Sequence, residues 1–181
     1  MIHIQRILQQ DLSLQNLSKI ALGVMFLFAC SQIYIPLQPV PITMQTVGVM
    51  AIGVTCSMRI AISTIISYLL IGALGMPVFS LYGAGFARII GPAGGYLVGF
   101  VPAVYLMTKL QNKLNMHKMR DIFINCMIGT TIIFTFGISW LAYLTSFKAA
   151  ILNGFLPFVV PGIFKALALT VILKGVSSKK D

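Results

Sequence analysis

Apolar runs alternate with short polar or basic connectors along the whole chain, and six of these runs are long enough to form helices. The predicted helices are Ile20–Pro36, Thr46–Met58, Ile60–Leu74, Gly94–Leu110, Ile122–Thr145 and Leu156–Leu173. The second and third are shorter than the roughly 20 residues that a straight membrane span needs. The pattern predicts an all-α membrane protein with six transmembrane helices in one domain, residues 20–174. An N-terminal cytoplasmic or interfacial segment, residues 1–19, precedes this domain, and a basic cytoplasmic tail, residues 175–181, follows it.

The connection between the third and fourth predicted helices is rich in glycine and proline. Eight of the sixteen glycines and two prolines fall within Gly72–Phe100. The segment holds too many of these residues for a plain helix, and it is too apolar for an ordinary solvated loop. Irregular backbone near membrane depth is tolerated only where protein buries it or where it lines a cavity. This Gly/Pro-rich loop is therefore the first candidate for a binding site.

Charged residues make up 9% and hydrophobic residues 58% of the 181-residue chain, whereas a soluble domain has about 25% charged residues. The three acidic residues, Asp11, Asp121 and Asp181, and both histidines lie outside the apolar runs. Proton relays, metal sites and intramembrane enzymes need such groups inside the membrane, so we expect no enzyme, no metal and no cofactor. The three cysteines stand singly in apolar segments, as small buried side chains do.

The net charge of +10 comes from basic residues that flank the apolar runs. With six spans, ten of these residues fall on the side that holds both termini, and only Arg88 and Lys148 fall in connectors on the other side. This bias places the termini in the cytoplasm and the Gly/Pro-rich loop on the outer face of the cytoplasmic (inner) membrane. It also indicates the lipid bilayer, and not a nucleic acid, as the partner of these charges.

Two cations on the outer half of the protein need a partner. Lys165 lies eight residues past Pro157, about 12 Å along the sixth helix, and therefore inside the hydrocarbon core. A lysine there costs at least about 2.5–3.5 kcal/mol, and the sequence places no acidic residue to neutralise it. An anionic ligand would explain Lys165, as would hydrogen bonds to helix-end carbonyls or water. Arg88, beside GPAGG, could bind a carboxylate through its guanidinium fork or could bind lipid headgroups.

An outward-open cavity for a small anion needs walls as well as cations. We expect a polar edge from Gln45, at the end of the extended, proline-containing connector Leu37–Gln45, and apolar walls from four aromatic residues. The four are Phe79, Tyr82, Tyr96 and Trp140. Each of these five side chains could equally serve the core, the membrane interface or the backbone. Together with Lys165 and Arg88 they form the predicted substrate-binding set.

Three parts of the chain resemble the BioY family, the biotin-binding S components of energy-coupling-factor (ECF) vitamin transporters. The first is IPLQPVPITMQTVGV at Ile35–Val49. The second is GALGMPVF, a glycine-rich linker and GPAGGYLVGF, within Gly72–Phe100. The third combines Gly137–Leu141, the LPF of Leu156–Phe158 and Lys165. The order and spacing of these parts are those of the family, and the resemblance covers most of the chain.

The resemblance implies a six-helix S component that captures biotin outside the cytoplasmic membrane and delivers it inward. It implies Lys165 as a residue of the binding site in the sixth helix. It also implies a transmembrane T component and two ATPase subunits as partners. Biotin suits the residues described above, because it offers a carboxylate for a cation, a ureido ring for hydrogen bonds and an apolar thioether ring.

The chain departs from the family pattern at several positions. Gly162 stands where the family often has an aspartate, three residues before the lysine, and Ala93 replaces the threonine of GPTGG. The first helix lacks the AxxxA patch that docks the T component, since Met25 follows Ala21 at that spacing. An S component or a solitary transporter for another small anionic vitamin is therefore the alternative. A structural membrane protein without a ligand is the less favoured one.

Overall fold

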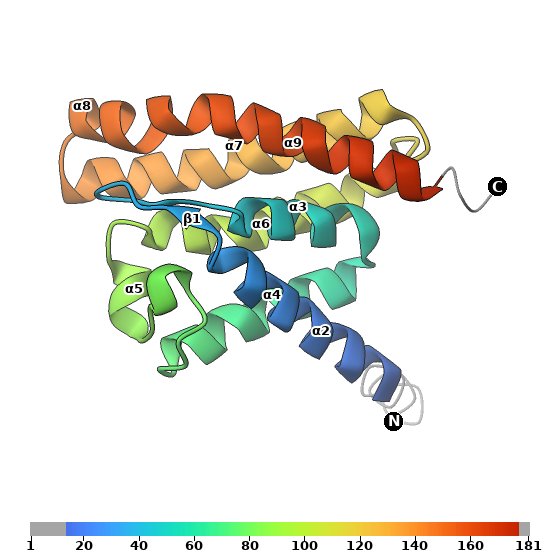
Figure 1. Ribbon diagram of the computed structural model, residues 1–181, viewed down its shortest axis with the longest axis horizontal. Coiled ribbons are helices and arrows are strands. Elements are labelled where there is room, and N and C mark those ends of the chain that lie inside the picture. The colour runs from blue at the N-terminus through green and yellow to red at the C-terminus, as the bar shows by residue number, and fades with distance from the viewer. Residues whose placement is uncertain (1–13, 178–181) are drawn as a thin grey trace, which may run out of the picture.

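The computed structural model describes residues 14–177 as a helical protein with one small hairpin (Figure 1). In chain order the elements are α2 (Leu14–Ser31), β1 (Tyr34–Ile35), β2 (Ile42–Thr43), α3 (Gln45–Thr55), α4 (Met58–Ala73), η1 (Ser80–Tyr82), α5 (Phe86–Ile90), α6 (Gly94–Gln111), α7 (Met119–Leu144), α8 (Phe147–Ala150), η2 (Ile151–Phe155) and α9 (Leu156–Ser177). The strands pair antiparallel, with Tyr34 opposite Thr43. Most of the interfacial segment predicted over residues 1–19 lies outside the described residues.

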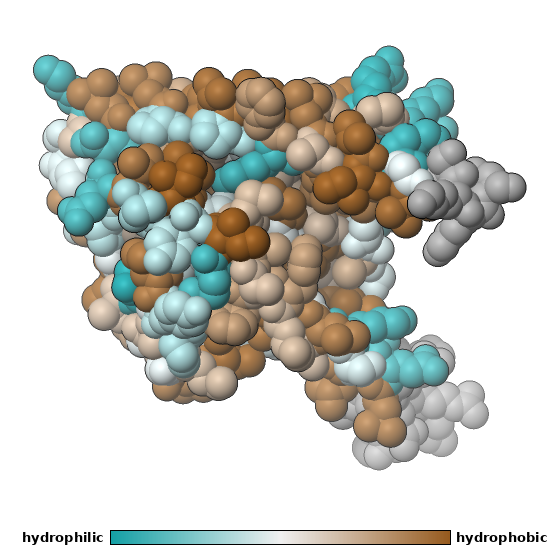
Figure 2. Space-filling model, viewed as in Figure 1, coloured by the Kyte–Doolittle hydropathy of each residue, from teal (hydrophilic) through white to brown (hydrophobic). Residues whose placement is uncertain are grey.

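The helices bring both described ends of the chain to one end of the molecule. α2 begins and α9 ends there, and the short helices α5 and α8 lie at the opposite end (Figure 1). α7 and α9 run side by side, and α6 packs against α7 over the largest helix–helix contact. Figure 2 shows apolar surface along the side formed by α7 and α9, with hydrophilic residues gathered at the two ends.

Three helical segments within residues 14–177 have the length and apolar character needed to cross a membrane: Leu14–Ser31, Met119–Leu144 and Phe147–Val176. At most 39% of the residues in the most apolar window of each segment are buried inside the protein, so most of their apolar side chains face outward. Apolar side chains on the surface are favourable in contact with lipid and unfavourable in contact with water. The chain is therefore an integral membrane protein. α3 and α4 are apolar but shorter, as the sequence predicts.

The end of α4 sets the shape of the Gly/Pro-rich loop. Gly75 has a φ of +105°, its N–H donates to the Gly72 carbonyl, and the N–H of Met76 donates to the Ile71 carbonyl, each at 3.2 Å. This is a Schellman motif, which favours glycine at the position of positive φ, and Pro77 follows it and cannot continue the helix. The loop is not wholly irregular, because it contains the short elements η1 and α5.

The first predicted helix, Ile20–Pro36, differs from the structure at both ends. α2 already includes Leu14, and it ends at Ser31. Tyr34 and Ile35, shortly after its end, are aromatic and β-branched and precede Pro36, a combination that favours extended backbone. They form β1, and the predicted extended connector contains its partner β2.

The sixth predicted helix, Leu156–Leu173, is part of a longer helical run. The side chain of Ser146 accepts a hydrogen bond from the Ala149 N–H at 3.2 Å, so that a helix begins at Phe147. The prediction that Lys148 lies in a loop is therefore wrong. α8, the π-helical turn η2 and α9 follow one another without a break, and α9 continues to Ser177, past the predicted boundary at residue 174.

Candidate binding cavity

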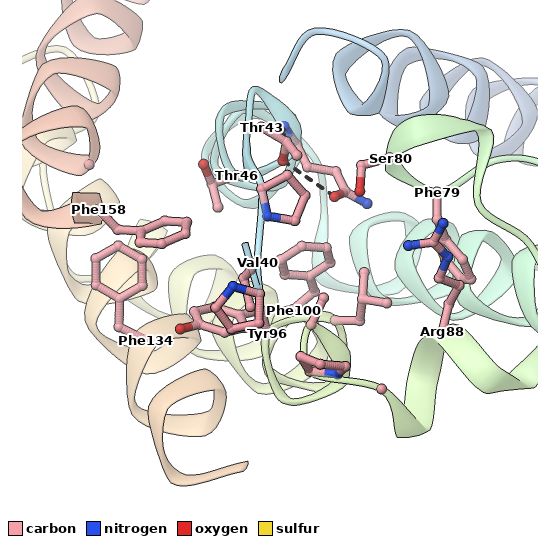
Figure 3. A pocket seen from close by; sticks show the side chains of 18 of the residues that line it. Val40, Thr43, Thr46, Phe79, Ser80, Arg88, Tyr96, Phe100, Phe134 and Phe158 are labelled. Carbon is pink, nitrogen blue, oxygen red and sulfur yellow. Dashed lines mark hydrogen bonds between the residues drawn. The ribbon is translucent and has the colours of Figure 1, made fainter. Parts of the chain in front are cut away.

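One cavity gathers most of the residues that the sequence singles out. It lies between the proline-containing connector, the loop after α4, and the helices α3, α5, α6, α7 and α9, and its volume is about 150 Å³. Figure 3 shows Phe134 and Phe158 at one side of this cavity and Arg88 at the other, with Thr43 and Thr46 between them. The cavity is thus assembled from segments that are distant in the sequence.

Lys165 reaches the cavity from α9. Its Nζ donates to the Thr43 carbonyl at 2.6 Å and to Thr46 Oγ1 at 3.4 Å, both near the start of α3. Asp121 is the one acidic residue within residues 14–177, and it pairs with Arg120 at 3.1 Å. Within the described part of the chain, the ammonium group of Lys165 therefore bonds to neutral acceptors and has no carboxylate partner. An ammonium group has three N–H donors, so one of them remains for a ligand.

Gln45 begins α3 and is buried, with 5% of its surface exposed. Its Nε2 donates to the Tyr68 hydroxyl at 2.6 Å, and Tyr68 in turn donates to the Val78 carbonyl at 2.8 Å. Thr43 Oγ1 lies 3.4 Å from Gln45 Oε1 and donates to it. This series of hydrogen bonds joins the connector, α4 and the loop after α4. It fixes the Gln45 side chain before any ligand arrives.

An aromatic cluster forms the apolar wall of the cavity. The Tyr96 and Phe158 rings stack with centroids 6.0 Å apart and an interplanar angle of 24°. Phe134 meets both rings edge-on, at 6.4 and 6.3 Å. The Tyr96 hydroxyl donates to the Gly154 carbonyl at 2.7 Å, so it serves the contact with η2, and the ring of Tyr96 serves the cavity.

Arg88 occupies the exposed side of the cavity. It belongs to the short helix α5, and its guanidinium lies so close to Gly83 that a Cβ there would sit 2.6 Å from Nε. Within residues 14–177 its guanidinium forms no ion pair. Phe79 lies on the same side, buried over Gly72 and edge-on to Tyr68 at 5.5 Å. The exposed guanidinium is therefore available to a ligand at the opening.

The structure brings together five of the seven predicted site residues and places two elsewhere. Lys165, Arg88, Phe79, Gln45 and Tyr96 all line the cavity. Tyr82 is 65% exposed and is not among the lining residues. Trp140 lines a separate apolar hollow between α5, α6 and α7, and its Nε1 donates to the Gly91 carbonyl at 3.0 Å. The indole thus fixes the backbone just before α6.

Several lining residues were not picked out from the sequence. Thr46 and Thr130 add hydroxyls, Ser80 adds a third, and Phe134 and Phe158 complete the aromatic wall. The LPF segment of the family resemblance contains Phe158, which gave a signal for that residue. No such signal marked the threonines, since a hydroxyl inside a helix usually bonds to its own backbone, as Thr130 does to the Cys126 carbonyl at 2.9 Å.

The arrangement suits binding better than catalysis. An apolar body can pack against the aromatic wall, and the two cations and several hydroxyls of the lining can bind polar groups. The lining residues include no histidine, cysteine or carboxylate that could act as a nucleophile or general base. The cavity can thus hold a small molecule that combines an apolar body with anionic or polar groups.

Comparison with known proteins identifies the family. The model of the BioY family matches residues 5–180, nearly the whole chain. This chain belongs to the BioY family. The "Probable biotin transporter BioY" of Rickettsia prowazekii (strain Madrid E) is 37% identical over 165 residues, which cover 91% of this chain and 84% of the relative. A protein of the same description from Pyrococcus horikoshii is 33% identical and covers 87% of this chain and 93% of the relative.

A solved structure shares the fold of this BioY-family chain. It is described as the S-component for biotin from an ECF-type ABC transporter, determined at 2.1 Å. The two chains superpose with a TM-score of 0.81 over 91% of each, at 23% sequence identity. The family resemblance inferred from the three sequence segments is confirmed by these matches, and so is the expectation of a transporter and not an enzyme.

Proposed function

We propose that this BioY-family chain takes up biotin, as an S component that captures the vitamin outside the cytoplasmic membrane and delivers it inward. The observation that carries the proposal is the cavity, whose lining combines an aromatic wall with two cations, Lys165 and Arg88. Biotin has an apolar thioether ring between a ureido group and a carboxylate. Relatives that are described as biotin transporters match this chain over most of its length, which supports the same substrate.

The proposed topology has six spans: α2, α3, α4, α6, α7 and α9. An even number of spans returns the chain to its starting side, and α2 and α9 have their free ends at the same end of the molecule (Figure 1). The basic connector between α6 and α7 belongs to that cytoplasmic end. The cavity, α5 and α8 belong to the outer end, where biotin arrives.

The two cations have different environments, and these suggest how biotin is oriented. Lys165 is partly buried and already bonded to two neutral acceptors, so a neutral ureido oxygen suits its remaining donor. Arg88 is exposed and presents a planar fork, so a carboxylate there keeps part of its hydration and can bind bidentately. This orientation assigns the carboxylate to Arg88, whereas the sequence alone favoured Lys165 as the partner of an anion.

Any dependence of transport on ATP has to come from other proteins. The sequence contains no G-x-x-x-x-G-K-[ST] motif for ATP. The proposed partners are a transmembrane T component and two ATPase subunits, and transport by this chain alone is the alternative. Uptake of labelled biotin by cells that contain the chain with and without such a module distinguishes these two modes.

Equilibrium binding to the purified protein in detergent tests the substrate and its orientation. Wild type, Arg88→Ala and Lys165→Met are each titrated with biotin and with biotinamide, which lacks the carboxylate charge. Loss of a charged partner costs about 2 kcal/mol or more, roughly a 30-fold change in Kd. We expect Arg88→Ala to weaken biotin by this amount and biotinamide little, and Lys165→Met to weaken both ligands equally.

Lys148→Ala is the matched control, because it removes the other outer cation, in α8, which does not line the cavity. Its Kd should equal that of wild type. If Lys165→Met weakens only biotin, the carboxylate lies at Lys165 and the orientation is reversed. If folded wild type binds neither ligand, biotin is not the substrate and other small anionic vitamins are the next candidates.

A further inference from the structure

Gln32, the first residue after α2, bonds to the loop that forms the outer side of the cavity. We propose that Gln32 is a positioning residue for ligand binding, which acts through the turn Phe79–Gly83 on the placement of Arg88. The inference rests on the proposed function only for the identity of the ligand. No sequence pattern singles out Gln32, which follows an apolar span and lies 47 positions before Phe79.

The Gln32 amide bonds to both ends of one short stretch of backbone. Its Nε2 donates to the Phe79 carbonyl at 3.0 Å, and its Oε1 accepts from the Tyr82 N–H at 3.2 Å. The same Nε2 donates to Ser31 Oγ at 2.6 Å, and Ser31 Oγ donates to the Val78 carbonyl at 2.8 Å. The end of α2 is therefore bonded to Val78, Phe79 and Tyr82.

The turn needs an external partner because of its backbone conformation. Leu81 and Tyr82 have φ values of 60° and 51°, a left-handed conformation that is unfavourable for residues with a side chain. Within the turn, the Phe79 N–H donates to the Gly83 carbonyl at 3.0 Å, and the Gly83 N–H donates to the Ser80 carbonyl at 3.1 Å. These bonds leave the Phe79 carbonyl and the Tyr82 N–H unused, and the Gln32 amide satisfies both groups.

The conformation of the turn determines what lies at the opening of the cavity. Phe79 and Ser80 line the cavity directly. Gly83, the last residue of the turn, lies against the Arg88 guanidinium, where a Cβ would be 2.6 Å from Nε and 2.9 Å from Cζ. A shift of the turn therefore moves the surface on which the guanidinium rests. Gln32 itself is not a lining residue, so it acts on the ligand through the turn.

Substitution of Gln32 by methionine tests this role, because methionine keeps the length of the side chain and removes both hydrogen-bonding groups. Gln111→Met is the matched control. Gln111 also spans two backbone groups, with Nε2 donating to the Gly53 carbonyl at 2.7 Å and to the Cys56 carbonyl at 3.1 Å, but on helix α6 and away from the cavity. The readouts are amide hydrogen exchange of residues 79–83 without ligand, and Kd for biotin and biotinamide.

We expect Gln32→Met to accelerate exchange in residues 79–83 at least tenfold, to weaken biotin binding at least tenfold, and to reduce the preference for biotin over biotinamide. Gln111→Met should change neither the exchange of this turn nor the two Kd values, even where the melting temperatures of the two variants fall equally. Gln32→Glu keeps the acceptor for the Tyr82 N–H and loses the donor to the Phe79 carbonyl, so it should give intermediate exchange.

Wild-type exchange and wild-type ligand preference in Gln32→Met would overturn the proposal. An equal change in Gln111→Met would overturn it too, since the effect would then be a general loss of stability. If wild type binds no biotin, the proposed function fails but the exchange measurement still decides whether Gln32 holds the turn. If Gln32→Met does not fold, Gln32→Glu provides the same comparison.

Discussion

Gly162 leaves space one helical turn before Lys165, on the inner surface of the cavity. A Cβ at this position would meet Phe134 Cζ at 3.4 Å and Thr130 Cγ2 at 3.5 Å, which is ordinary van der Waals contact. The position could therefore accept a small side chain without repacking of the aromatic wall. By the resemblance, relatives often carry an aspartate at this position. In the proposed orientation the ureido N–H groups therefore need other acceptors, and Thr46 and Thr130 line the cavity.

Gly162→Asp is expected to tighten biotin binding about tenfold. Its carboxylate would lie three residues before Lys165 on α9 and therefore within reach of the ammonium group. It would also accept hydrogen bonds from the ureido N–H groups, and hydrogen bonds to a charged acceptor are stronger than those to a neutral one. Titration calorimetry measures the change, and Gly162→Asn is the control of equal size without charge. An equal loss of affinity in both variants would show that the side chain fills space that the ligand needs.

The sequence could single out some residues of the candidate cavity and could not place others, for physical reasons. Lys165 is recognisable because a charge inside an apolar run is costly, and Arg88 because it stands in a loop too apolar to be solvated. Tyr82 stands in the same loop, but the left-handed backbone at Leu81 and Tyr82 has no sequence signature, and Tyr82 is exposed beside the cavity. Gln32 was missed because its partners are backbone atoms about 50 positions away.

The pairing of α6 with α7 gives the cavity its aromatic wall. Gly137 on α7 faces Tyr96 on α6 so closely that a Cβ would lie 2.3 Å from the ring. Small residues at such points let two helices approach in a membrane, where packing and not the hydrophobic effect holds them together. The same contact orients the Tyr96 ring towards Phe158, so the helix pairing also determines the shape of the wall.

Gly137→Val should lower stability by about 1–3 kcal/mol, the usual range for overpacking, and should weaken biotin binding because the Tyr96 ring has to move. Thermal unfolding in detergent and biotin titration measure the two effects. Gly175→Val is the control, since it changes the same residue type in α9, where a Cβ meets nothing within 4 Å. The interpretation fails if the two variants lose the same stability and bind biotin equally well.

Helix positions were more predictable than helix ends. The apolar runs located α3, α4, α6 and α7 to within a few residues, because each run is bounded by proline, glycine or charge. The ends that were missed depend on single hydrogen bonds or on local backbone preference. Ser146 starts α8 through its side chain, and α2 stops at Ser31, whose hydroxyl also bonds to Val78 across the fold. Hydropathy alone carries no information about such bonds.

At the scale of the whole molecule, charge is segregated along the helix axes. The connector between α6 and α7 contains Lys113 and Lys118, and it lies at the end where α2 begins and α9 ends (Figure 1). Arg88 and Lys148 lie on α5 and α8 at the other end. The positive-inside rule predicts that the end with the basic connector faces the cytoplasm. The proposed topology can therefore be tested by labelling residues at the two ends.

Single cysteines should report the two sides of the membrane. In a chain whose three native cysteines are replaced by alanine, we expect Lys148→Cys to react with a membrane-impermeant maleimide in intact spheroplasts. We expect Lys113→Cys to react only after the membrane is opened. Biotin uptake by the cysteine-free chain serves as the control for folding. Reaction of Lys113→Cys in intact spheroplasts would reverse the orientation, and equal reaction of both would contradict an intact six-span topology.

The hydrogen bond from Lys165 to the Thr43 carbonyl joins residues 122 positions apart, and this separation has a consequence for biogenesis. Membrane proteins are inserted as they are synthesised, so the connector and the loop after α4 are in place before α9 leaves the ribosome. Until then the Thr43 carbonyl lacks its partner and the aromatic wall lacks Phe158. The cavity is therefore completed last, and we expect a chain whose synthesis stops before α9 to occupy the membrane without binding a ligand.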